Sequence, residues 1–137
     1  MHAVRGSLPA GYQVVLTGVA GEADRAEGAR ADMQGVQNLA GKTTVQELIN
    51  LLANARAVLA LDSGAAHIAA HLRVPLVVMT RTEAREGWWS EAMYDGRPTV
   101  LTEEGEDDEA PRTTPYPPSI ENLSLQTVVR SVLQCTI

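Results

Sequence analysis

The residues best suited to chemistry lie between positions 61 and 70, where an apolar run leads directly into Asp62, Ser63 and Gly64. This pattern predicts a buried strand followed at once by a helix, because Ser63 is a favoured N-cap residue. Gly64 has no side chain, so a ligand could approach the backbone closely at that point. The turn is therefore the first candidate for a binding site.

An anion is the ligand that such a turn is expected to hold. The first amides of the helix, those of Gly64, Ala65 and Ala66, are expected to point outward without an intramolecular partner. The helix dipole alone contributes about 0.3–1 kcal/mol, so holding a diphosphate also requires a cation. His67, one turn into the helix, is placed to donate to a phosphate oxygen or to stack beside it. The alternative is that the turn residues only cap the helix and that His67 is a half-buried packing residue.

A lysine that could supply the cation lies in the segment 38–44, Asn-Leu-Ala-Gly-Lys-Thr-Thr. The segment is similar to a phosphate-binding P-loop, but that motif requires a glycine five positions before Gly41, where Val36 stands. We therefore reject a P-loop. Lys42 still precedes a predicted helix and could neutralise a ligand phosphate as a point charge. The alternative is an ordinary surface lysine.

A carboxylate, Glu22, follows the glycine-bearing turn at residues 18–21 and is expected at the mouth of the same cleft. Carboxylates in this position commonly accept ribose hydroxyls, although an acid at a helix start also has a purely electrostatic explanation. The neighbouring Trp88 and Trp89 could face a sugar or a base, but they are more typical of packing or of a contact between domains. Cys135 has no activating neighbour and is expected to be inert.

The elements that must position these residues alternate along the chain. Short β-branched runs predict strands, and the windows between them have the apolar period of helices. Thr44, with Glu47 three residues later, predicts a capping box on a helix whose buried face includes Val45. The run 57–61 is apolar throughout, as a central parallel strand should be. Strands are predicted at residues 13–18, 36–39, 57–61, 75–79 and 99–101, and helices at 22–33, 45–52, 65–72 and 124–133.

This alternation predicts an α/β fold with a doubly wound parallel sheet. In such sheets ligands lie beyond the carboxyl ends of the strands, where loops lead into helix N-termini. The candidate loops are therefore residues 18–22, 39–44, 62–67 and 80–86.

Composition and charge restrict the class of protein. A chain of 137 residues suggests one domain, and six of its seventeen acids lie between residues 103 and 109, within a long loop expected to be mobile. The remaining acids and the bases are equal in number, eleven each, so the sequence offers no basic face for nucleic acid. A single cysteine excludes an internal disulfide, no apolar run is long enough to span a membrane, and residues 1–11 have no apolar centre of a signal peptide. The chain is expected to be soluble and cytoplasmic.

Together these segments resemble glycosyltransferase family 9, the ADP-heptose:lipopolysaccharide heptosyltransferases. The resemblance covers about residues 12–79. Aspartate-serine-glycine alone also occurs in sugar-nucleotide epimerases, so the lysine-bearing loop about twenty residues upstream of Asp62 adds specificity. After the fourth strand many relatives have glycine-proline-threonine, whereas this sequence has Thr80-Arg81-Thr82. The resemblance is carried by residues 14–18 with Glu22, 39–44 with Glu47, 62–70, and 74–78.

The resemblance implies a two-domain GT-B fold whose Rossmann-like C-terminal half holds the nucleotide-sugar donor. This chain is similar to that half only, so residues 1–137 are expected to form a single donor-binding domain, with residues 103–118 as a mobile loop and the N-terminal acceptor domain absent. By the same resemblance, Glu22 would accept the adenosine ribose, Thr43 would lie near the nucleoside, and Lys42 would contact phosphate or sugar. Asp62 would bind the heptose hydroxyls, and the diphosphate would be held by Ser63, Gly64, Ala65 and His67.

The implied function is transfer of heptose from ADP-heptose to a lipopolysaccharide core acceptor, without a metal or other cofactor. The family uses an aspartate base from the N-terminal half, so no catalytic base is assigned in this chain. The isolated chain is expected to be inactive, whereas the full-length protein would be a glycosyltransferase. Peripheral association of that protein with the inner membrane is compatible with this function.

Two alternatives stay open at this point. One is a stand-alone α/β module without catalytic activity that serves in binding. The other is a fragment of a sugar-nucleotide epimerase, which would prefer UDP to ADP.

Overall fold

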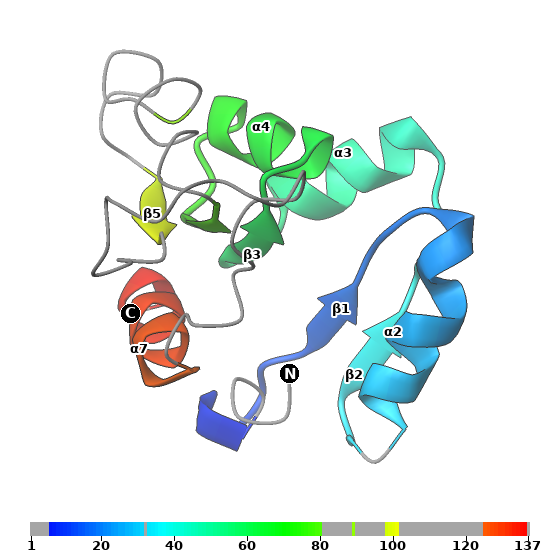
Figure 1. Ribbon diagram of the computed structural model, residues 1–137, viewed down its shortest axis with the longest axis horizontal. Coiled ribbons are helices and arrows are strands. Elements are labelled where there is room, and N and C mark those ends of the chain that lie inside the picture. The colour runs from blue at the N-terminus through cyan, green and yellow to red at the C-terminus, as the bar shows by residue number, and fades with distance from the viewer. Residues whose placement is uncertain (1–5, 32, 81–88, 90–97, 102–124, 137) are drawn as a thin grey trace, which may run out of the picture. The chain divides into compact units, whose positions relative to one another are not determined.

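The computed structural model describes residues 6–31, 33–80, 89, 98–101 and 125–136 (Figure 1). Strands and helices alternate along this part of the chain, and every described strand pair is parallel, which confirms the predicted α/β class. The strands form two sheets, with the orders β1-β2 and β3-β4-β5. The chain divides into two compact units, Met1–Asn54 with the first sheet and Ala55–Ile137 with the second.

The first unit is built on two short strands and the helices that follow them. β1 and β2 pair in the register Val14↔Val36 and Leu16↔Asn38. Along β2, Val36 and Asn38 are buried whereas Gln37 is exposed, which is the alternation of a strand with one covered face. The elements are β1 (Val14–Leu16), η1 (Ala20–Glu22), α2 (Ala23–Arg30), β2 (Val36–Asn38) and α3 (Val45–Ala53).

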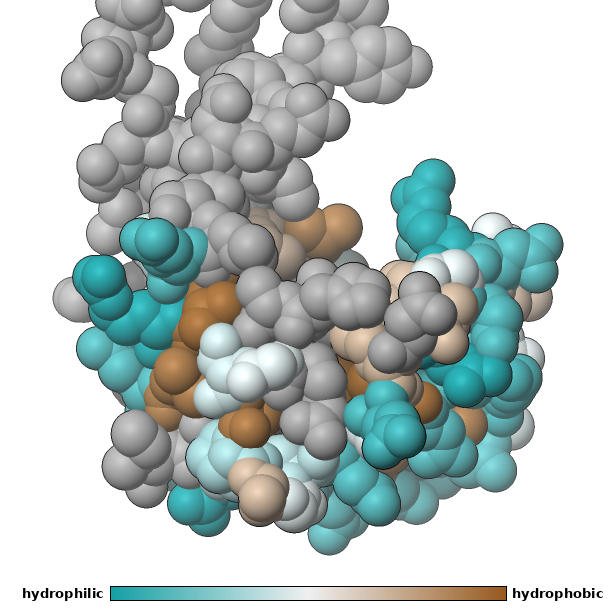
Figure 2. All heavy atoms as spheres, turned by 90° about the horizontal axis from the view of Figure 1, so that it is seen from below, coloured by the Kyte–Doolittle hydropathy of each residue, from teal (hydrophilic) through white to brown (hydrophobic). Residues whose placement is uncertain are grey.

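Helix α2 packs against β2 through small side chains (Figure 1). Ala23, Ala26 and Ala29 are half-buried on one side, as their spacing predicts, and no residue of the helix is fully buried. The predicted helix start at Glu22 is instead the last residue of the short 3₁₀ turn η1. Figure 2 shows polar, teal side chains over the right-hand side of its view, where α2 lies in Figure 1.

Helix α3 begins with the predicted capping box. The Glu47 amide donates to Thr44 Oγ1 at 3.3 Å, and the Glu47 carboxylate accepts from the Thr44 amide at 2.7 Å. The backbone bond to Thr44 and the further bond from its hydroxyl lower the pKa of Glu47. Leu52 is buried, but the expectation that Val45 is buried is wrong, since that side chain is 70% exposed. Val45 is the first residue of the helix and precedes the stretch that faces the core.

The second unit contains β3 (Val58–Leu61), α4 (Gly64–His71), β4 (Leu76–Met79), β5 (Thr99–Leu101) and α7 (Leu125–Thr136). β4 lies between β3 and β5, and its residues Leu76, Val77 and Val78 are at most 1% exposed. The run 57–61 was expected to be a central strand, but within this sheet β3 is an edge strand and its residue Leu61 is 51% exposed. Continuous apolar sequence marks both strands, and only the strand order distinguishes them.

The two helices of this unit pack on β4. α4 buries Ala66 and Ala69, and the closing helix α7 buries Val128 and Val132 on its predicted apolar face. α4 ends in a Schellman motif, in which the Arg73 amide donates to the Ala70 carbonyl and the Val74 amide donates to the Ala69 carbonyl. Arg73 occupies the left-handed position of this motif, with φ +60°, where glycine is usual.

The predicted mobile loop at 103–118, its acidic run 103–109, and Trp88 lie outside the described residues. Among the helices that the structure describes, none has both the length and the apolar character needed to cross a bilayer.

Candidate functional site

The turn between β3 and α4 has the predicted capping geometry. Ser63 is the N-cap of α4 in an extended conformation, with φ −157° and ψ 164°, and its hydroxyl oxygen accepts from the Ala66 amide at 3.4 Å. Gly64 is the first helical residue, one position earlier than expected. The sequence Ser-Gly therefore ends the strand and starts the helix within two residues, which leaves the backbone at the helix start exposed.

The amides at this turn are only partly available to a ligand. Ala66 was expected to offer a free amide, and this is wrong, because the Ser63 hydroxyl occupies it and Ala66 is fully buried. The amides of Gly64 and Ala65 donate to no atom in the described part of the chain. A Cβ placed on Gly64 would meet nothing within 4 Å, so the side-chain position of this residue is open. Two of the three expected donors thus remain for an anion.

Asp62 lies between a hydroxyl and an imidazole. Thr80 Oγ1 donates to Asp62 Oδ2 at 3.4 Å, and His67 Nε2 lies 3.5 Å from Asp62 Oδ1. Thr80 itself is buried and its amide donates to the Leu101 carbonyl, which attaches it to the backbone of β5. The carboxylate is therefore held by a hydroxyl that follows β4 and by an imidazole one turn into α4, while its side chain stays 36% exposed.

His67 also stacks on Trp89. The two ring centroids are 4.4 Å apart and the ring planes differ by 8°. Trp89 is 4% exposed, whereas the His67 side chain is 31% exposed. The indole is buried, which confirms the expectation that Trp89 has a packing role. The stacking partner, His67, was not expected from the sequence.

In the first unit, the loop after β2 is closed tightly against the turn after β1. The Gly41 amide donates to the Gly18 carbonyl at 2.9 Å, and Gly41 has φ +70°. A Cβ at Gly41 would lie 2.7 Å from the Cα of Ala20. Only glycine fits this crossing of two backbones, and the crossing sets the start of the Lys42–Thr44 segment.

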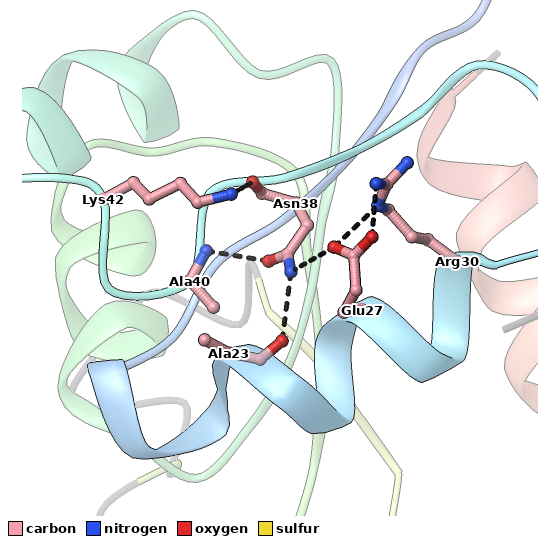
Figure 3. A network of polar contacts seen from close by, with 6 residues as sticks. All are labelled: Ala23, Glu27, Arg30, Asn38, Ala40 and Lys42. Atoms are coloured by element: carbon pink, nitrogen blue, oxygen red, sulfur yellow. Dashed lines mark hydrogen bonds and ion pairs between the residues drawn. The ribbon is translucent and has the colours of Figure 1, made fainter.

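Asn38 is the centre of the polar network that supports this loop (Figure 3). Its side-chain amide donates to the Ala23 carbonyl at 3.1 Å and to Glu27 Oε2 at 3.0 Å, and its oxygen accepts from the Ala40 amide at 3.0 Å. Lys42 Nζ donates to the Asn38 main-chain carbonyl at 3.0 Å. The ammonium thereby contacts the end of β2, although Lys42 as a whole stays exposed.

Glu27 links this network to the surface of α2. Its carboxylate accepts from the Arg30 guanidinium through two nitrogens and from Asn38. The Arg30 bonds, followed by the Asn38 bond, lower the pKa of Glu27 from 4.5 to about 2, and the same carboxylate raises the pKa of Arg30. Glu27 is therefore ionised at any neutral pH and fixes the orientation of the Asn38 amide.

Glu22 has a structural partner in the first unit. Its Oε2 accepts from the Val19 amide at 3.0 Å, which caps η1, and a Cβ at Gly18 would come within 2.5 Å of the same oxygen. This supports the capping interpretation of Glu22, and its role toward a ribose stays a prediction. Thr43, the remaining candidate, is half-buried beside Lys42 in the loop.

The candidates fall into two groups. The second unit brings together the turn residues, with His67 and the carboxylate of Asp62 in contact at its edge. The first unit brings together the lysine loop and the glycine turn that carries Glu22. That Lys42 faces the same ligand as Gly64 stays a prediction. Within the described residues, no group of three or more His, Cys, Asp or Glu side chains is arranged to hold a metal ion.

Sequence reasoning missed Asn38 and Thr80. The sequence does contain a feature that indicates the role of Asn38. Asn38 lies two residues from Val36 on the buried face of β2, and a buried polar side chain requires hydrogen-bond partners. The indication for Thr80 is weaker. This residue directly follows an apolar strand, at the edge of the sheet where ligands bind in this class of fold. Thr80 is also the first of the three residues that stand where many relatives have glycine-proline-threonine. The other two, Arg81 and Thr82, lie outside the described residues.

The chain is similar in sequence and in fold to known heptosyltransferases. A model of glycosyltransferase family 9 (heptosyltransferase) matches residues 5–88. Lipooligosaccharide heptosyltransferase 2 of Haemophilus influenzae is 50% identical over 42 residues, which are 31% of this chain and 12% of that protein. A solved structure of Escherichia coli ADP-heptose lps heptosyltransferase II has a similar fold, with a TM-score of 0.71 at 24% identity over 98% of this chain. This chain spans 39% of that structure.

Proposed function

The chain belongs to glycosyltransferase family 9, and from this premise we propose that it is the donor-binding part of a heptosyltransferase. The ligand is a nucleotide-diphosphate sugar of the ADP-heptose class. The observation that carries the proposal is the start of α4, where the amides of Gly64 and Ala65 donate to no atom in the described part of the chain and the contact between Asp62 and His67 lies in the same turn. This turn lies within the residues that match the family.

The chemistry of the turn suits a diphosphate. Two backbone amides at the positive end of a helix dipole attract an anion, and an imidazole one turn later supplies a further donor. When the bond between sugar and diphosphate breaks, negative charge grows on the departing diphosphate, and the same donors stabilise it. The residues for this step are Ser63, Gly64, Ala65 and His67, with Lys42 as the additional cation.

Sugar and nucleoside would be held by the remaining candidates. Asp62 accepts from sugar hydroxyls, because its carboxylate is fixed at the ligand edge of the sheet yet 36% exposed. Glu22 accepts from the ribose, and Thr43 lies near the nucleoside. The catalytic base and the acceptor, a lipopolysaccharide core sugar, belong to the part of the protein beyond this chain, so this chain alone binds donor weakly and transfers nothing.

Residues 1–137 act as one donor-binding domain in this proposal, and the domain works in the cytoplasm, where its single cysteine requires no disulfide partner. Association with the inner membrane, where it occurs, is peripheral. The match to a glycosyltransferase model gives no support to an epimerase fragment or to a module outside this chemistry.

The direct test is titration of ADP into the ¹⁵N-labelled chain, followed by NMR. We expect shifts at residues 18–22, at Lys42 and at residues 62–67, and weaker shifts with UDP at the same concentration. Absence of shifts at both Gly64 and Lys42 would contradict the proposal.

A matched pair of glycine variants makes the test specific. A methyl at Gly64 meets no protein atom within 4 Å, and the same is true of Gly28 in the middle of α2. Neither Gly64→Ala nor Gly28→Ala should therefore destabilise the fold, because alanine is the better helix former. We expect only Gly64→Ala to weaken ADP binding, since its methyl occupies the space of the phosphate. Equal ADP affinity in both variants would exclude the α4 turn as the diphosphate site.

A further inference from the structure

We propose that Trp89 is a positioning residue, whose indole holds the imidazole of His67 in the orientation that receives the donor's diphosphate. The proposal rests on the proposed function, which puts the diphosphate at the start of α4. Trp89 itself does not touch the ligand in this proposal. It acts through His67.

The first observation is the stack itself. An interplanar angle of 8° at a centroid distance of 4.4 Å means that the indole covers one face of the imidazole. Trp89 is 4% exposed, so it is fixed by its surroundings, whereas the His67 side chain keeps 31% of its surface accessible. The buried ring is the support, and the accessible ring is the one that can meet a ligand.

The second observation is that the imidazole is also held at its edge. His67 Nε2 lies 3.5 Å from Asp62 Oδ1, and the other oxygen of that carboxylate accepts from the buried Thr80. A flat ring that is held on one face and at one edge loses the freedom to rotate about χ2. Its position relative to the Gly64 and Ala65 amides is therefore set before a ligand arrives.

The third argument concerns the choice of residue types. Burial of an indole on α4 does not require a histidine, since the buried positions of that helix, Ala66 and Ala69, are both alanine. An imidazole ring can, however, stack flat on an indole, and the two rings are nearly parallel here. Ordering the side chain in advance reduces the entropy lost on binding.

The test combines the free chain with an ADP titration of the variants. In the free wild-type chain, we expect nuclear Overhauser contacts between the His67 ring protons and the Trp89 indole. We also expect His67 ring resonances displaced upfield relative to His71, the second histidine of α4. Trp89→Phe retains a stacking ring and should keep both the displacement and the ADP affinity. Trp89→Met retains apolar volume without a ring and should lose the displacement and weaken ADP binding about three- to tenfold.

The outcomes separate this proposal from the proposed function. If wild-type chain shows no contact between the His67 and Trp89 rings, the positioning role is wrong even where ADP binds. If Trp89→Met loses the upfield displacement but binds ADP as tightly as Trp89→Phe does, the stack is only structural and the proposal is overturned. If ADP does not bind the wild-type chain although the stack is present, the proposed function fails and the positioning role fails with it. If Trp89→Met does not fold, two other measurements decide whether the positioning role is right. These are the ring contacts in the wild-type chain and the ADP affinity of His67→Asn, which we expect to fall by the same factor or more.

Discussion

Replacing Asn38 by alanine is the strongest test of how the lysine loop is supported. Asn38 is 6% exposed, and its side chain makes three hydrogen bonds, two donated and one accepted. The substitution removes all three and leaves the Ala40 amide, in a residue that is 1% exposed, without its acceptor. Because Lys42 docks on the carbonyl of the same residue, loosening position 38 also loosens the lysine.

The magnitude follows from the surroundings of each bond. A buried amide left without an acceptor costs about 1–3 kcal/mol, and the loss of the bond to the Ala23 carbonyl adds about 0.5–1.5 kcal/mol at most. The exposed Glu27 carboxylate can instead bind water. We expect Asn38→Ala to lower the free energy of unfolding by about 2–4 kcal/mol. That is a large part of the about 5–15 kcal/mol typical of a domain.

The assay is urea unfolding followed by circular dichroism, with amide hydrogen exchange as the local readout. Gln37→Ala is the matched control, because Gln37 lies on the same strand with its side chain exposed, and it should change the free energy by about 0.5 kcal/mol or less. In Asn38→Ala the Ala40 amide should exchange much faster than in either the parent or the control. If the two variants unfold alike and Ala40 remains protected, the reasoning about the buried network is refuted.

Two further predictions concern stability. Arg73→Gly should raise the free energy of unfolding by about 0.5–1 kcal/mol in urea denaturation, because φ +60° is unfavourable for a residue with a Cβ, and Arg73→Ala, which keeps the Cβ, should give no such gain. Since hydrogen bonds lower the pKa of Glu27 from 4.5 to about 2, its stabilisation is complete above pH 4.5 and is lost as the pH falls toward 2. Glu27→Gln should therefore flatten the pH dependence of unfolding in that window, and a slope equal to that of the parent chain would contradict the assignment.

The elements that a local pattern defines were predicted from the sequence. The Thr44–Glu47 capping box depends on a spacing of three residues, and Ser63 with Gly64 starts α4 within one residue of the expected position. These features require no knowledge of distant neighbours. They are decided by backbone hydrogen bonding within one turn of a helix.

The features that depend on pairing between distant segments could not be predicted in the same way. β3 and β4 are both continuously apolar, so their sequences do not say that β4 is the strand with a neighbour on each side. His67 and Trp89 have no periodic relation along the chain, yet their rings stack. The free amide expected at Ala66 failed for a different reason, since the residue that favours the turn, Ser63, also uses one of its donors.

The docked position of Lys42 has a consequence for which ligands the loop can distinguish. Its ammonium already donates to a backbone carbonyl, so a ligand that binds the ammonium must replace that hydrogen bond. A neutral nucleoside offers no better acceptor than a peptide carbonyl and leaves the lysine where it is. A phosphate oxygen, being charged, forms the stronger hydrogen bond, so we expect an anionic group to displace this contact where a neutral group does not.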